Sequence, residues 1–328
     1  MTVTNSVLPW HKPYWAMMES ALARDQMHHA LLLHGLSGLG KLHFAQSLAA
    51  LMLCESETDA GQQPCGQCRG CQLNKAGSHP DKLSLMPEDG KTQISVDQVR
   101  ALINENVLTS HYGGYRVIIL SPAHSMSANA ANALLKTLEE PPLRHVFILV
   151  SDSPNQMPVT LRSRCVSLLF GPPQSQQAKS WLADKSSLEV DWDFWLKWTG
   201  GAPLAALEAA THTDIKAIQA NFRGISELVQ GRADPVAMAQ QWRSNGLSES
   251  LDWQLRLLGQ LMQQCTTQNS WASVPNISEI ASHLDWSGMN RIYDELMELR
   301  DAEVRNLHPN DRLSLESLAV TWQLASSR

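Results

Sequence analysis

The sequence has no apolar run long enough to span a membrane, and basic residues are few. It holds 26 lysines and arginines against 32 aspartates and glutamates, which gives a net charge of −6. A free-standing nucleic-acid binder usually carries a basic domain, and a spanning helix needs roughly 20 apolar residues. The start, MTVTNSVLPWHKPYW, also lacks the basic-then-apolar form of a signal peptide. We therefore expect a cytoplasmic protein with no membrane contact. The charge argues against a free-standing nucleic-acid binder and leaves room for a subunit that touches DNA only within an assembly.

Cysteine is scarce as well, with six residues in a chain of 328. In the cytoplasm disulfides are rare, so the thiols are expected to be free or to bind a metal. The length suits two or three domains rather than one. Apolar residues make up 43% of the chain, which is enough for well-buried cores.

The first half of the sequence alternates between strand-like and helix-like stretches. Uniformly apolar strand centres separated by helices predict a parallel sheet that is covered on both faces. We expect helices over residues 42–54 and 127–142, the second ended by two prolines that cannot continue it. We expect buried strands over residues 28–35, 116–122, 145–152 and 163–170.

Strand signals stop after residue 171, and the remaining chain is helical. A short helical region follows, in which the tryptophans between residues 181 and 198 are expected to pack in a core. We place domain borders near residues 171 and 211. Cys265 continues an apolar stripe at helical spacing and is expected to be buried, and Cys165 is expected to be structural.

Residues 34–44, HGLSGLGKLHF, have the outline of a phosphate-binding P-loop, G-x-x-x-x-G-K-[ST]. Gly35, Gly40 and Lys41 are in place. Glycines let backbone N–H groups turn toward phosphate oxygens at a helix N-terminus, and the lysine adds positive charge. These residues are the candidate nucleotide-binding set.

The parts of a P-loop that hold Mg²⁺ are missing. Leu42 stands where a serine or threonine hydroxyl belongs, and the strand that should end in a carboxylate is followed by Ser121 and Pro122. Three interpretations remain open. The loop is a tight strand-to-helix connection with a solvated lysine, or it holds nucleotide without turnover, or it hydrolyses ATP slowly.

Four cysteines form the spacing C-x₁₀-C-x₂-C-x₂-C: Cys54, Cys65, Cys68 and Cys71. Four thiolates that converge on one point close a structural Zn²⁺ site. An iron–sulfur cluster is the alternative metal centre, although the Cys-Pro that closes ferredoxin motifs is absent. Free or redox-active thiols are the third alternative, and His79 could replace one ligand.

Several stretches together resemble one family. They are NALLKTLEEPP at 132–142, PVTLRSRC at 158–165, CGQCRGCQL at 65–73 and NLHPNDRLSLESL at 306–318. The chain resembles the AAA+ clamp-loader subunits of bacterial DNA polymerase III. The resemblance implies an AAA+ nucleotide-binding-type domain over 1–170 with a zinc insert at 54–71, a small helical lid over 171–210, and a helical collar for oligomerisation over 211–328.

The resemblance also implies partners and a role. Such a chain would join delta and gamma/tau subunits in a hetero-pentamer that loads the beta sliding clamp onto primed DNA in the replisome, at the nucleoid. The gamma/tau motor has both metal-binding motifs of the P-loop fold intact. This sequence departs from both, with Leu42 in the first and Ser121 and Pro122 in the second. It resembles the family's non-hydrolysing stator, which is an accessory subunit of a DNA-directed DNA polymerase.

In the family, the arginine of the SRC motif is an arginine finger, and that residue is Arg164 here. It would reach ATP bound by the neighbouring subunit, where a guanidinium can fork onto phosphate oxygens. The plainer alternative is a surface or interface salt bridge, and Arg162 is expected to be a solvated neighbour. Asp152 and Leu204 stand near the positions where the family's active members carry sensor residues.

Two other functions stay open. The first is an active AAA+ ATPase with a divergent Mg²⁺ site, which ATP turnover by the isolated chain would reveal. The second is a zinc-ribbon DNA-binding or redox protein, which would need a basic surface or a reactive thiol pair. The net charge of −6 disfavours DNA binding.

Overall fold

The computed structural model describes residues 7–56, 63–105, 114–267, 277–304, 307 and 309–326. The chain divides into two compact units. The first comprises Met1–Leu196 and Gly200–Leu207, and the second comprises Lys197–Thr199 and Glu208–Arg328. A separate lid over 171–210 and a collar from 211 remain predictions. In the described parts of the chain, no helix is long and apolar enough to cross a bilayer.

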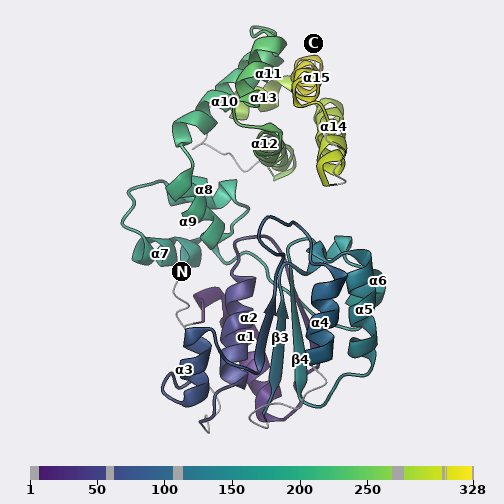
Figure 1. The fold of residues 1–328 in the computed structure, drawn as a ribbon. Coiled ribbons are helices and arrows are strands. Elements are labelled where there is room, and N and C mark those ends of the chain that lie inside the picture. Colours follow the sequence, from purple (N-terminus) through teal and green to yellow (C-terminus); the bar gives the residue numbers. More distant parts are fainter. Residues whose placement is uncertain are drawn as a thin grey trace. The chain divides into compact units, whose positions relative to one another are not determined.

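The first unit is built on a five-stranded parallel sheet in the order β2-β3-β4-β1-β5. Figure 1 shows α1 and α2 on one face of this sheet and α4, α5 and α6 on the other. The strands are β1 (Ala30–His34), β2 (Lys82–Leu85), β3 (Arg116–Leu120), β4 (His145–Ser151) and β5 (Val166–Leu169). The expected parallel sheet with helices on both faces is confirmed.

Alternate side chains of the central strands enter two different cores, as the pleat of a strand requires. Leu31 and Leu33 of β1 pack on one face with Phe44 of α2. Leu32, between them, packs on the other face with Leu134 of α5. Both faces are dry, which explains the uninterrupted apolar strand sequences.

The helices of the first unit begin near the chain start and alternate with the strands. They are η1 (Pro9–His11), α1 (Lys12–Ala23), α2 (Lys41–Met52), α3 (Arg69–Ala76), α4 (Val96–Glu105), η2 (Ala123–Ser125), α5 (Ala128–Glu139), η3 (Pro154–Gln156), α6 (Val159–Arg162) and α7 (Ser175–Lys185). The next two helices, α8 (Trp192–Trp198) and α9 (Pro203–His212), each have residues in both units. Ser127 caps α5, since its side chain accepts the N–H of Ala130. Trp195 and Trp198 are buried as expected, and Trp181 meets Trp10 edge to face.

The second unit is helical in its described residues. Its helices are α10 (Ile215–Val229), α11 (Pro235–Arg243), α12 (Leu247–Thr267), α13 (Ile277–His283), α14 (Trp286–Val304) and α15 (Asp311–Leu324). Trp242 and Trp322 are fully buried, and the indole N–H of Trp322 donates to Oε1 of Gln254 at 2.7 Å. The expectation for Cys265 is wrong, because this residue is exposed. It lies two residues before α12 ends, beyond the buried stripe that stops at Leu261.

Candidate functional site

The P-loop joins the end of β1 to the start of α2. Gly40 is the N-cap of α2 with φ = 85°, a left-handed conformation that glycine adopts without strain. Lys41 is the first helical residue, and its side chain is only 3% exposed. The loop therefore has the fold that the sequence predicts, but its lysine is buried rather than solvated.

The Lys41 ammonium is bound by groups of its own chain. Its Nζ donates to the carbonyl of Gly35 at 2.8 Å and to that of Leu36 at 2.5 Å. It also lies 2.6 Å from Oδ1 of Asp152, which directly follows β4. A buried ammonium needs such a partner, because an unpaired charge away from water is costly. The ammonium can use its three N–H donors fully on these contacts.

Other segments of the first unit brace the loop backbone. The N–H of Leu204, at the start of α9, donates to the carbonyl of Gly38 at 3.0 Å. A Cβ on Gly38 would lie 2.3 Å from Cβ of Ala205, so this close approach requires glycine. From the other end of the chain, Trp10 Nε1 and His11 Nε2 both bind the carbonyl of Leu39, at 2.9 and 2.8 Å. Burial lowers the pKa of His11 to about 4, so this ring is neutral near pH 7.

Histidines and serines surround Lys41 at the carboxyl ends of the strands. His34 Nε2 lies 2.8 Å from Oγ of Ser167, and His124 Nδ1 lies 3.1 Å from Oγ of Ser151. Burial lowers the pKa of both histidines, and the positive charge of Lys41 acts in the same direction. The strand end at β3 carries no carboxylate, as the sequence predicts.

The four cysteines come together at the end of α2 and the start of α3. The Sγ atoms of Cys54, Cys65, Cys68 and Cys71 all lie within 4.8 Å of one another. Cys54 and Cys68 are 3.9 Å apart, as are Cys65 and Cys71. Four sulfurs at about 2.3 Å from one tetrahedral Zn²⁺ would be about 3.8 Å apart, so this set fits zinc. Residues 57–62 of the predicted insert lie outside the described part of the chain.

Local geometry shapes the cysteine cluster. The Cys65 sulfur accepts the N–H of Cys68, and the Cys68 sulfur accepts the N–H of Cys71 and caps α3. Hydrogen bonds from Ser56 and then from the backbone lower the pKa of Cys65 to about 6, whereas burial raises that of Cys71. His79 is not one of the clustered residues, and its Nδ1 accepts the N–H of Asp81.

Arg164 lies in the turn between α6 and β5, the edge strand of the sheet. Its Nη1 donates to the carbonyl of Thr160 at 2.8 Å, and its Nη2 lies 2.5 Å from Oε1 of Glu139. The Arg164 side chain is 35% exposed, so a partner can still reach it. The salt bridge that the sequence left as an alternative is thus present within the chain. Arg162 approaches Asn155 at 3.5 Å instead.

Two partners in these sites, Glu139 and Thr160, were missed from the sequence, and Asp152 was noted there without its contact with Lys41. Asp152 had a usable signal, because an acidic residue just after a buried strand lies at the same sheet edge as the P-loop. Leu204 and Asp152 both contact the loop directly. The contacts of Glu139 and Thr160 with Arg164 depend on how α5 packs against α6, which periodicity does not reveal.

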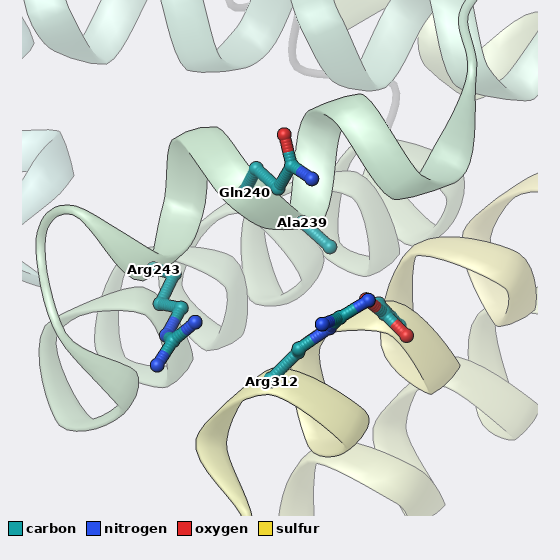
Figure 2. A pocket seen from close by; sticks show the side chains of 5 residues that line it. Ala239, Gln240, Arg243 and Arg312 are labelled. Atoms are coloured by element: carbon teal, nitrogen blue, oxygen red, sulfur yellow. The ribbon is translucent and has the colours of Figure 1, made fainter.

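The second unit has a small surface pocket of its own. Its volume is about 160 Å³. The pocket is lined by Ala239, Gln240 and Arg243 of α11 and by Arg312 and Glu316 of α15. Figure 2 shows the side chains of Arg243 and Arg312 extending from the two helices. Arg312 Nε lies 2.7 Å from Oε1 of Glu316. None of the predicted site residues lines this pocket.

A glycine-rich loop that joins a strand to a helix at the carboxyl edge of a parallel sheet has the form of a P-loop nucleotide-binding fold. The family model described as "DNA polymerase III, delta subunit" matches residues 10–174. DNA polymerase III subunit delta' of Pseudomonas aeruginosa is 34% identical over 96% of this chain and 97% of its own length. The chain belongs to the family of DNA polymerase III delta' subunits, which are clamp-loader subunits.

Two further relatives complete the comparison. DNA polymerase III subunit tau of Salmonella typhimurium is 34% identical over 45% of this chain and 22% of tau. A gamma subunit-related protein of Thermotoga maritima has a solved structure with a TM-score of 0.43 and 14% identity, covering 94% of this chain and 99% of that one.

Proposed function

We propose that this chain is the stator of a DNA polymerase III clamp loader. It would join delta and gamma/tau subunits in a hetero-pentamer that places the beta sliding clamp on primed DNA, and it would hydrolyse no ATP itself. The names of its delta' and tau relatives support the assembly. A cytoplasmic location at the replisome follows from this role. The second unit would serve as the collar, with the segment 171–210 as the lid.

The observation that carries the non-hydrolysing role is the state of the P-loop. Lys41 is buried and paired with Asp152, and Leu42 packs against the core instead of offering a hydroxyl. Phosphoryl transfer depends on charge neutralisation by the lysine and a bound metal ion. A loop without the metal ligands, with its lysine already paired, supports a structural role for Gly35, Gly40 and Lys41.

Arg164 is the proposed contribution of this subunit to hydrolysis by a neighbour. It lies at the rim of the first unit, beside the edge strand, and remains partly exposed. A guanidinium is always charged and can bind phosphate oxygens with two parallel hydrogen bonds. Such a finger in trans stabilises the charge of the transition state.

We also propose that the four-cysteine cluster holds a structural Zn²⁺. Sulfur spacings of 3.9 Å and the three backbone N–H groups directed at sulfur support this assignment. When bound, the ion would tie the end of α2 to the start of α3. Because binding a structural zinc supplies folding free energy to small elements, the ion would stabilise this corner of the unit.

Reconstitution tests the proposed role. Purified chain is mixed with the delta and gamma/tau subunits of the same organism, and assembly is followed by size-exclusion chromatography. ATP hydrolysis and clamp loading on primed DNA are then measured with and without the chain. We expect no ATPase from the chain alone and full clamp loading only when it is present. Loading at the full rate without it would contradict the stator role, and lysine-dependent turnover by the chain alone would favour the active-ATPase alternative.

A further inference from the structure

The guanidinium of Arg164 is held by two groups from two different helices. Its Nη2 lies 2.5 Å from the carboxylate of Glu139, the last residue of α5. Its Nη1 donates to the backbone carbonyl of Thr160 in α6 at 2.8 Å. The two acceptors grip different nitrogens, so together they fix the plane of the guanidinium and not only its position.

Both acceptors rest on one buried core. Leu138 precedes Glu139 and is 2% exposed, and Leu161 follows Thr160 and is fully buried. The two leucines belong to the same apolar cluster beneath the sheet. Rigidly packed neighbours hold Glu139 and Thr160 in fixed places, which is what an oriented side chain requires of its supports.

The two contacts leave other N–H donors of the guanidinium available. Arginine has five N–H donors, and the contacts with Glu139 and Thr160 use one on Nη1 and one on Nη2. The side chains of Arg164 and Glu139 are 35% and 50% exposed. Arg164 can therefore stay bound to both acceptors and still donate to an anion that arrives from solvent or from a neighbouring subunit.

We propose that Glu139 is a positioning residue for Arg164. This inference rests on the proposed function, in which Arg164 completes the ATP site of a neighbour. An exposed ion pair contributes little to stability, so the contact acts through orientation. A long arginine side chain loses rotamer freedom when it binds phosphate. A carboxylate that already selects the productive rotamer raises the rate of the chemical step at the neighbouring site.

The test uses the complete, reconstituted loader. Glu139→Ala, Glu139→Gln and Arg164→Ala are compared, together with Glu139→Ala made in the Arg164→Ala background. Glu140→Ala is the matched control, because Glu140 is also an exposed glutamate at the end of α5 and forms no salt bridge within the described residues. The readouts are kcat and KM for clamp- and DNA-stimulated ATP hydrolysis, and the rate of clamp loading.

We expect Glu139→Ala to lower the loading rate about tenfold, because small misplacements of a catalytic group are costly. The loss should fall on kcat, with KM for ATP unchanged. Glu139→Gln, which keeps an oxygen acceptor, should lose less, and Glu140→Ala should match the wild type. In the Arg164→Ala background, Glu139→Ala should cause no further loss.

Three results would overturn the inference. If Glu139→Ala hydrolyses ATP and loads clamps at the wild-type rate or faster while Arg164→Ala is impaired, Arg164 would keep its proposed role and Glu139 would have none. A further loss in the Arg164→Ala background would show that Glu139 acts by another route. Wild-type activity of Arg164→Ala would remove the proposed finger itself, and the inference with it.

Discussion

The Lys41 ammonium and the Asp152 carboxylate form an ion pair of 2.6 Å at the carboxyl edge of the sheet. The lysine side chain is 3% exposed and the aspartate side chain 41% exposed. The pair joins the first residue of α2 to the residue that follows β4. A P-loop lysine, whose usual partner is a phosphate, is here neutralised by a side chain of its own domain.

Removing Asp152 should destabilise the fold. Asp152→Ala leaves a buried ammonium with carbonyl partners only, and breaking a buried pair costs about 3–5 kcal/mol. Because Asp152 is partly exposed and screened by water, we expect about 1–2 kcal/mol, measured by urea unfolding. Asp97→Ala is the control, since the Asp97 side chain is 89% exposed and pairs with Arg100 at 3.8 Å. Equal unfolding free energies for the two variants would show that the carboxylate does not stabilise Lys41.

The isolated chain should show no ATPase activity above background in the presence of Mg²⁺. Leu42 supplies no hydroxyl, and β3 ends without a carboxylate, so no protein ligand for the metal is offered at either place. Steady-state phosphate release from the pure chain is the measurement, with Lys41→Ala as the control. Turnover that disappears in Lys41→Ala would establish an active site.

The purified protein should carry about one zinc ion. Cys68→Ser should lower both metal content and thermal stability, because Cys68 is a predicted ligand and also caps α3. Cys265→Ser should change neither, since Cys265 is an exposed thiol on α12. Metal analysis of freshly purified protein is the test. Iron with visible absorbance, or no metal at all, would refute the zinc assignment.

Arg164→Ala should leave folding and assembly nearly intact while it impairs the loader. Substituting a partly exposed side chain usually changes stability by about 0.5 kcal/mol or less, and one rim contact adds little to a large interface. Clamp-stimulated ATP hydrolysis and clamp loading should fall, and Arg164→Lys should restore little, because a point charge cannot fork onto phosphate. Arg162→Ala should be mild. Wild-type loading by Arg164→Ala complexes would reduce Arg164 to an interface residue.

His11 should make the fold sensitive to acid. Its pKa is about 4 in the folded protein against 6.5 ordinarily, so unfolding takes up a proton between these values. The contribution of neutral His11 to the free energy of unfolding is fully present above pH 6.5 and is lost as the pH falls through 4. The loss approaches about 3 kcal/mol. Urea unfolding of the wild type and His11→Gln across this range should show a steeper acid slope for the wild type, and parallel profiles would contradict the assignment.

Much of the sheet could be predicted because buried parallel strands are apolar throughout. The central strands β1, β3 and β4 lie within the ranges expected from the sequence. The edge strand β2 (Lys82–Leu85) was missed, since its sequence KLSL is short and half-buried and carries little apolar signal. Pairing with β3 makes this segment a strand, and pairing is not encoded in its own composition.

The sites were predictable to the extent that their residues are neighbours in sequence. The spacing of Cys65, Cys68 and Cys71 already predicts that their sulfurs converge. The acidic partners of Lys41 and Arg164 come from 111 and 25 residues away along the chain, and only the packed elements bring them into contact. For the same reason, the stripe that suggested a buried Cys265 could not show that the core ends one turn earlier.

The contact between Gly38 and Ala205 changes what a glycine-rich loop signifies in this chain. A side chain at position 38 would collide with α9, and position 40 has a φ of 85°, which residues with a side chain rarely adopt. Both positions would demand glycine in a protein that never meets a nucleotide. The glycine positions of a P-loop motif can thus be required by packing, whether or not the loop binds a nucleotide.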